Sequence, residues 1–148
     1  MNSPSSSTPS FDQALSFLPH GPEFRFLDRL VTLEPGKSGV GEYSVRGDEP
    51  FLRGHFPAQP IFPGVLLLEA AAQLAGVVAQ SDPQIPPLSG LKLTAVRGAK
   101  ILGTAKPGET LQIEAAVTGR LGNLVQGRGY EVLGPDGSVV SYLRRTGP

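Results

Sequence analysis

Hydrophobic side chains leave no polar face in one stretch of the chain, residues 64–80. It holds Val65, Leu66, Leu67, Leu68, Leu74, Val77, Val78 and five alanines. A helix that is apolar all round is buried in a protein core. Seventeen residues with Glu69 and Gln73 in the middle disfavour a membrane span, which needs ~20 uniformly apolar residues. We therefore predict a core helix over 64–80.

Two stretches before this helix have the pattern of strands. Aromatic and β-branched residues dominate 24–34, and a second strand-like run spans 38–46. Such residues favour the half-buried surface of a sheet, and Pro35-Gly36 between the two runs suits a turn. We predict a hairpin here, preceded by a short amphipathic helix over 11–18 that Pro19 closes.

The second half of the chain also has strand character. Apolar residues occupy every second position from 111 to 117, as in a strand with one covered face. Pro107-Gly108 and Asp136-Gly137 supply turns. The pattern predicts strands over 88–102, 110–118, 123–133 and 138–143.

One buried helix, a hairpin before it and strands after it predict an α+β domain, in which an antiparallel sheet wraps around the central helix. The chain has 148 residues without a repeat or long linker, so we place a single domain at 11–148. Residues 1–10 are rich in Ser and Pro and lack the basic start and apolar run of a signal peptide. We expect a disordered lead there and a cytoplasmic protein.

Charge and cysteine content exclude several classes of function. Thirteen basic and thirteen acidic residues give a net charge of zero, so no bulk attraction to nucleic acid or to an anionic membrane is expected. Cysteine is absent. Disulfides, thiolate metal sites and cysteine nucleophiles are therefore excluded, and no Ser elbow or metal-ligand cluster is found in the sequence.

Two titratable residues stand out against this background. His55 lies in Gly54-His55-Phe56-Pro57, and a histidine accepts protons near neutral pH. Glu69 is the one carboxyl group in the apolar helix, and burial favours the neutral, proton-carrying form of a carboxyl. Gln73, four positions later, shares its helix face and can hydrogen-bond to it. Gly64 begins the helix, where unpaired amides suit a carbonyl oxygen that gains negative charge.

These residues alone leave structural roles open. A lone loop histidine such as His55 commonly packs, and a buried glutamate such as Glu69 commonly makes structural hydrogen bonds. His20 lies between Pro19 and Gly21, and we interpret it as a turn or packing histidine. Asp28, Arg25 and Arg29 are interpreted as solvated or salt-bridged.

A set of motifs nevertheless resembles a known family along most of the chain after residue 17. The sequence is similar to the (3R)-hydroxyacyl-[acyl-carrier-protein] dehydratases of type II fatty acid synthesis, which adopt the hot-dog fold. The segments that carry the resemblance are Leu18-Pro19-His20, Phe26-Leu27-Asp28-Arg29, Glu49-Pro50-Phe51, Gly54-His55-Phe56-Pro57, Pro60-Ile61-Phe62-Pro63-Gly64-Val65-Leu66 and Glu69-Ala70-Ala71-Ala72-Gln73.

The resemblance implies loss of water from a β-hydroxyacyl thioester, which yields a trans-2-enoyl thioester. It implies that His55 removes the α-proton, that the partner subunit's Glu69 assists departure of the hydroxyl, and that the Gly64 amide polarises the thioester carbonyl. Phe56 and Val65 would position these groups or line the acyl tunnel. The family further implies a homodimer, often a trimer of dimers, and no cofactor besides the phosphopantetheine that carries the substrate on acyl carrier protein.

Several positions differ from the family pattern and bear on acyl length and carrier docking. Arg53 stands where glutamine is usual, and Ile101 where phenylalanine is usual; the others are Ala58, Phe62, Ala95 and Gly103-Thr104. Arg53, Arg97 and Lys100 are candidates for docking an acidic carrier protein, against the alternative of ordinary surface cations. Two other functions remain open: a hot-dog thioesterase, or a non-catalytic hot-dog subunit that binds the acyl carrier.

Overall fold

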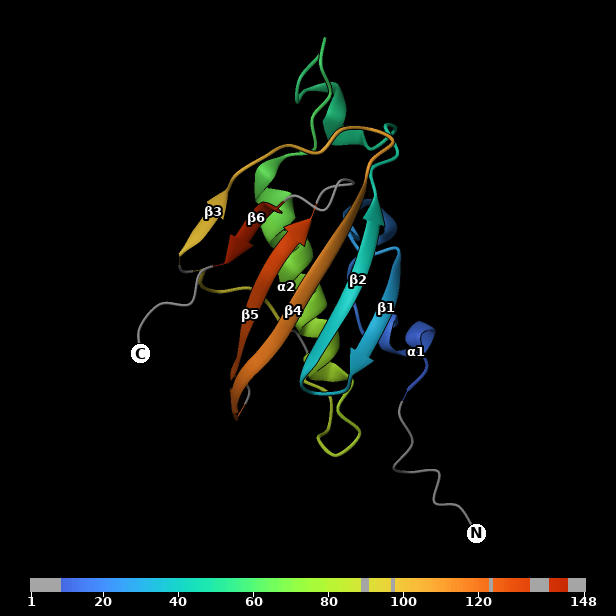
Figure 1. Cartoon of the computed structure of the whole chain (residues 1–148). Helices are drawn as coiled ribbons and strands as arrows, with labels where there is room; N and C mark the ends of the chain where they lie inside the picture. Colours follow the sequence, from blue (N-terminus) through green and yellow to red (C-terminus); the bar gives the residue numbers. More distant parts are fainter. Residues whose placement is uncertain (1–8, 89–90, 97, 123, 134–138, 144–148) are drawn as a thin grey trace.

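The molecule is one antiparallel sheet that curves around a single long helix, α2 (Figure 1). The computed structural model describes residues 9–88, 91–96, 98–122, 124–133 and 139–143. Six strands lie in the order β1-β2-β4-β5-β6-β3, and every pair is antiparallel. The predicted α+β architecture is confirmed.

The elements follow one another along the chain as helices, short 3-10 turns (η) and strands. They are α1 (Phe11–Leu15), η2 (Pro22–Phe24), β1 (Arg29–Glu34), β2 (Ser38–Ser44), η3 (Pro50–Arg53), α2 (Gly64–Gln80), β3 (Ala99–Ile101), β4 (Thr110–Leu121), β5 (Leu124–Leu133) and β6 (Val139–Leu143). Residues 1–8, most of the expected lead, and the turn expected at 136–137 lie outside the described residues.

The central helix has the predicted bounds and packs closely on the sheet. Leu67, Leu74 and Val78 are fully buried on α2. A Cβ atom added at Gly39 of β2 would lie 3.0 Å from Val78 Cγ2, so the glycine helps the helix to pack this closely on the strand. Within the part of the chain that the structure describes, no helix is long and apolar enough to cross a membrane.

The hairpin before the helix is confirmed, but its first strand begins later than predicted. β1 and β2 pair from Arg29↔Glu42 to Glu34↔Ser38. The Asp28 amide still donates to Glu42 O of β2, at 2.7 Å. Phe26, in contrast, is turned away from the sheet ladder, because its amide donates to the Gln73 side chain of α2, at 2.9 Å. A tertiary hydrogen bond has replaced the strand pairing that the composition favoured.

Other predicted bounds were also wrong in part: β2 ends at Ser44 and not at 46. The helix over 11–18 is α-helical only to Leu15, since Phe17 and Leu18 donate to carbonyls three residues back. The strand over 88–102 is reduced to Ala99–Ile101, which pairs with 141–143 of the short strand β6. β4 extends to Leu121 because its pairing with β5 continues to their connection.

Candidate active site

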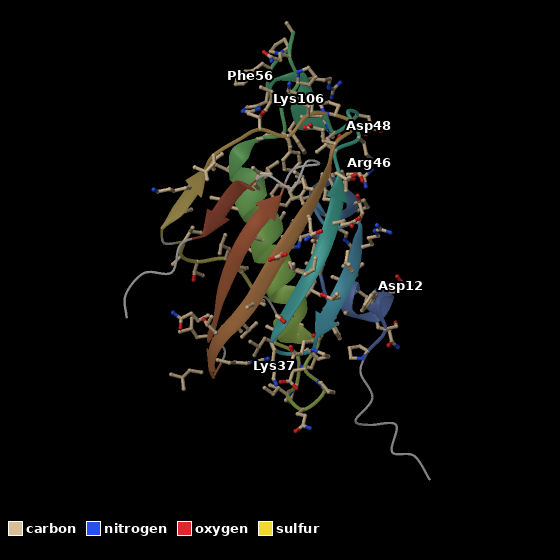
Figure 2. All side chains as sticks on the ribbon, in the orientation of Figure 1. Asp12, Lys37, Arg46, Asp48, Phe56 and Lys106 are labelled. Carbon is tan, nitrogen blue, oxygen red and sulfur yellow. The ribbon has the colours of Figure 1, made fainter. Side chains whose placement is uncertain are left out.

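His55 lies on the loop between η3 and α2, at the end of the molecule where α2 begins. Figure 2 shows its neighbour Phe56 at the tip of this loop, beyond the body of the sheet. The His55 amide donates to Leu52 O at 3.2 Å, and the Ile61 amide donates to His55 O at 2.8 Å. The backbone of His55 is therefore hydrogen-bonded both to η3 before the loop and to Ile61 at its far side.

The imidazole itself is oriented by the same loop. His55 Nδ1 lies 2.8 Å from the carbonyl oxygen of Ile61, and the ring stacks on Phe56 with centroids 4.2 Å apart. Because a carbonyl oxygen only accepts, Nδ1 carries the hydrogen of this bond. The neutral ring then presents the lone pair of Nε2, which is the state that a general base needs.

Glu69 lies in the middle of α2, and its side chain is 20% exposed. Gln73 Nε2 donates to Glu69 Oε2 at 3.0 Å, which confirms the predicted pair. Gln73 is buried and is held in turn by Phe24 O and the Phe26 amide, each at 2.9 Å. The carboxyl group of Glu69 is thus oriented by an amide side chain that cannot rotate freely.

His20 is the residue near this carboxyl that sequence reasoning missed. Its Nε2 lies 3.4 Å from Glu69 Oε2, its ring stacks on Phe24, and its buried Nδ1 has no partner among the described residues. The interpretation as a turn or packing histidine thus left out a contact across 49 positions of sequence. The only signal for it was Leu18-Pro19-His20 within the resemblance.

Both of these contacts fall on one oxygen of Glu69. Gln73 and His20 approach Oε2, so the contacts of the described residues leave Oε1 as the oxygen for a substrate group. A carboxyl held through one oxygen can donate a proton from the other.

The start of α2 supplies the third part of the expected site. Its N-cap is Pro63, which has no side-chain capping bond, and the Leu66 amide donates to Pro63 O at 2.9 Å. The Gly64 amide lies at the positive end of the helix dipole. A Cβ atom at Gly64 would lie 2.8 Å from Ile101 Cδ1. The Ile101 side chain, on β3, therefore lies directly over Gly64.

Among the described residues of one chain, no contact joins His55 to Glu69. The contacts of His55 are with its own loop, whereas those of Glu69 are with Gln73 and His20. Phe56 and Val65, at the same end as His55, are 51% and 66% exposed. Neither side chain is therefore enclosed in a tunnel by the described residues of one chain.

Two of the candidate docking cations lie on different elements. Arg53 ends η3 beside the His55 loop, and Lys100 lies on the edge strand β3; both are exposed. Arg97 lies outside the described residues. Among the described side chains, no three of His, Asp and Glu gather where they could hold a metal ion.

Comparison with known proteins identifies the family of this fold and site. A FabA-like domain model matches residues 18–140. The 3-hydroxyacyl-[acyl-carrier-protein] dehydratase FabZ of Chloroflexus aggregans is 42% identical over 105 residues, 71% of this chain and 72% of that protein. The protein of the same name from Roseiflexus castenholzii is 37% identical over 131 residues, 88% and 90% of the two chains.

A solved structure shows the same fold at low identity. The dehydratase heterocomplex ApeI:P from Xenorhabdus doucetiae superimposes with a TM-score of 0.70 at 19% identity, over 90% of this chain and 91% of that chain. The expected hot-dog fold is thereby confirmed. The chain belongs to the FabA-like family, in which its curated relatives are 3-hydroxyacyl-[acyl-carrier-protein] dehydratases.

Proposed function

We propose that this chain is a 3-hydroxyacyl-[acyl-carrier-protein] dehydratase, which converts (3R)-3-hydroxyacyl thioesters into trans-2-enoyl thioesters in acyl-chain biosynthesis. The observation that carries the proposal is the orientation of His55. Its Nδ1 is bound to Ile61 O at 2.8 Å, so Nε2 is left to act as a base. Membership of the FabA-like family and similarity to the dehydratases named above support the same chemistry.

In the proposed reaction His55 Nε2 takes the α-proton of the substrate. Electrons of the broken C–H bond form the C=C bond, and the β-hydroxyl leaves as water after it receives a proton from Glu69 Oε1. The Gly64 amide stabilises the negative charge that develops on the thioester oxygen. The substrate arrives on the phosphopantetheine arm of acyl carrier protein, and the steps use no metal or further cofactor.

The second part of the proposal is that two subunits share each site. In one chain His55 contacts its own loop and Glu69 contacts His20 and Gln73, so the partner subunit's Glu69 would have to supply the acid. Phe56, Val65 and Leu102 are more than half exposed, and a second copy would cover apolar side chains of this kind. We propose a homodimer at minimum; a trimer of dimers and a cytoplasmic location stay predictions.

Turnover of short thioesters tests the chemistry. Wild-type protein should dehydrate 3-hydroxybutyryl thioesters and hydrate crotonyl ones. His55→Ala and Glu69→Gln should each lower kcat by ~10²–10⁴-fold, the contribution of a general acid or base. Glu34→Gln, which changes an exposed carboxylate at the end of β1, is the matched control and should keep full activity. A loss below tenfold in both site variants would refute the assignment.

Mixing the two inactive variants tests the shared site. Random pairing of His55→Ala with Glu69→Gln subunits makes half of the dimers mixed, and each mixed dimer holds one intact site out of two. Activity should therefore return to about a quarter of the wild-type value. Dimers that exchange subunits but stay inactive would show that both residues act within one chain.

The same assays separate the two alternative functions. Release of free thiol from acyl-CoA without an enoyl product would indicate a thioesterase. Binding of acyl carrier protein without turnover of either kind would indicate a non-catalytic subunit. Reversal of charge at Arg53 and Lys100 should weaken turnover of carrier-bound substrate and spare small thioesters, if these residues dock the carrier.

A further inference from the structure

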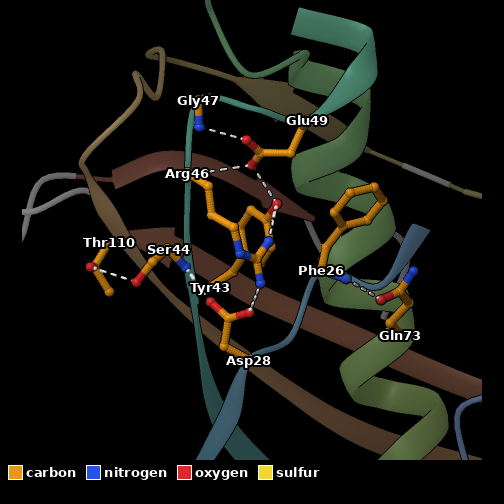
Figure 3. A network of polar contacts seen from close by, with 9 residues as sticks. All are labelled: Phe26, Asp28, Tyr43, Ser44, Arg46, Gly47, Glu49, Gln73 and Thr110. Carbon is orange, nitrogen blue, oxygen red and sulfur yellow. Dashed lines mark hydrogen bonds and ion pairs between the residues drawn. The ribbon is translucent and has the colours of Figure 1, made fainter. Parts of the chain in front are cut away.

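Glu49 is the buried carboxylate of the described chain that the proposed reaction does not use. Its residue is 8% exposed, and it immediately precedes η3, the turn that leads to His55. Tyr43 Oη donates to Glu49 Oε2 at 2.6 Å, the Arg46 amide donates to the same oxygen at 3.1 Å, and the Gly47 amide donates to Oε1 at 2.7 Å (Figure 3).

These bonds keep Glu49 ionised. Burial by itself would raise the pKa of this carboxyl, but the hydrogen bonds from Tyr43 and from backbone amides lower the pKa below its ordinary value. Burial, assisted by the Glu49 charge, raises the pKa of Tyr43 far above its usual range. At neutral pH Tyr43 is therefore a donor and Glu49 an acceptor.

A second carboxylate fixes the cation beside this pair. Arg46 Nη2 donates to Asp28 Oδ1 at 2.7 Å, and the Ser44 amide donates to Asp28 Oδ2 at 2.7 Å. The Arg46 guanidinium lies over the Tyr43 ring, 5.4 Å from its centroid. The end of β2 and the turn after it thus form a hydrogen-bonded binding site for the Glu49 carboxylate.

A short chain of hydrogen bonds runs from Glu49 to the histidine. The Leu52 amide donates to Glu49 O at 3.0 Å, and the His55 amide donates to Leu52 O at 3.2 Å. Leu52 is buried, and the neighbouring Phe51 packs on Phe62 with centroids 5.7 Å apart. The hydrogen bonds of Glu49 are therefore connected, through η3, to the backbone of His55.

We propose that Glu49 is a positioning residue for His55. Its carboxylate holds the start of η3 through three donors, while Ile61 holds the other side of the His55 loop. Release of the carboxylate would let the turn shift, and a base displaced by about 1 Å can lose ~10²-fold in rate. This inference deepens the proposed function, and only its kinetic test depends on that function.

The imidazole resonances of the full-length protein test it without any assay of activity. The chain has two histidines, His20 and His55, so the side-chain NMR spectrum is simple to assign. Glu49→Gln keeps the size of the side chain but replaces one acceptor oxygen with a donor. It should shift or broaden the His55 signals and leave those of His20 in place.

Steady-state kinetics supply the second measurement. Glu49→Gln should lower kcat tenfold or more, toward the ~10²-fold cost of misplacing a base, and leave KM within about twofold, because the substrate-binding surface is intact. Tyr43→Phe removes one of the three donors and should give a smaller loss in the same direction. If Glu49→Gln fails to fold, Tyr43→Phe alone decides the proposal by the same two readouts.

Ser44→Ala is the matched control. Ser44 is next to Tyr43 in the sequence, and its hydroxyl is hydrogen-bonded to that of Thr110 at 3.0 Å. This bond is not part of the chain of hydrogen bonds that connects Glu49 to His55. Ser44→Ala should change neither the His55 signals nor kcat. The proposal is overturned if folded Glu49→Gln leaves the His55 signals unmoved, or moves those of His20 equally. Wild-type protein without dehydratase activity would refute the proposed function, and the spectra would still decide the role of Glu49.

Discussion

The two ends of α2 differ in the hydrogen-bond partners that the rest of the chain provides. At the C-terminal end, Arg120 Nη1 donates to Ala79 O at 2.8 Å, and Gln80 exchanges two hydrogen bonds with the backbone of Leu88. Ser81 also donates to Val78 O, at 2.7 Å. At the N-terminal end, Pro63 supplies no side-chain cap.

Burial differs in the same way. Val77, Val78 and Ala79 near the C-terminal end are almost completely buried, whereas Val65 in the first turn is 66% exposed. A helix leaves amides unpaired at one end and carbonyls at the other, and each set needs partners. Here the chain itself supplies partners for the carbonyls. In the proposed function the Gly64 amide at the other end binds the substrate. We therefore expect the C-terminal, closed end to stabilise the fold and the N-terminal, open end to carry the chemistry.

The largest expected effect comes from adding one methyl group at the open end. Gly64→Ala would place a Cβ 2.8 Å from Ile101 Cδ1, so the side chain or the helix start must shift. Loss of an oxyanion donor costs ~10²–10³-fold, and a displaced donor should cost kcat at least about tenfold. Steady-state kinetics on a crotonyl thioester measure this.

Gly76→Ala in the same helix is the matched control. Its Cβ would meet Leu91 Cδ2 at an ordinary 3.6 Å, so activity should be kept, while the free energy of unfolding should rise by roughly 0.5–1 kcal/mol. Adding Ile101→Ala to Gly64→Ala makes room for the new methyl group and should restore part of kcat. Equal activity of the two single alanine variants would remove the distinction between the two ends.

An intermediate effect, on stability alone, is expected at the closed end. Arg120→Ala removes a charged donor from the last turn of α2 and should lower the free energy of unfolding by about 1–2 kcal/mol. Denaturant titration measures this, and kcat should stay at the wild-type value. Arg53→Ala, an exposed arginine beside the open end, should change stability by less than about 0.5 kcal/mol. A larger loss of unfolding free energy from Arg53→Ala than from Arg120→Ala would contradict the idea that the closed end stabilises the fold more than the open end.

The smallest expected effect is a difference in pH dependence. The pKa of Glu49 is lowered below its unfolded value of 4.5, so its stabilisation is fully present above that pH and is lost as the pH falls through the folded pKa. The gap in unfolding temperature between wild type and Glu49→Gln should therefore shrink below pH 4.5. The gap for Arg120→Ala should not follow this pattern, because the partners of Arg120 among the described residues are backbone carbonyls and not a carboxyl group. A Glu49→Gln gap that is constant down to pH 3 would show that the charge of Glu49 does not stabilise the fold.

Local pattern determined much of this protein. The uniformly apolar run has the predicted helix bounds, Gly64–Gln80, because hydrophobic character over seventeen residues is a strong signal in sequence. The Glu69–Gln73 hydrogen bond was predictable for the same kind of reason, since residues four apart share a helix face. His55 and Glu69 stood out because few titratable residues interrupt this part of the chain.

Tertiary structure decided the features that depend on distant parts of the chain. The approach of His20 to Glu69, the hydrogen bond from the Phe26 amide to Gln73 and the cover of Ile101 over Gly64 join residues that lie far apart in the sequence, at spacings with no period. Of the strand predicted over 88–102, only Ala99–Ile101 is a strand in the described structure, because β6 pairs with these three residues. A pattern along the chain reports which face of an element is apolar, whereas the partner of each polar group is set only when the elements pack together.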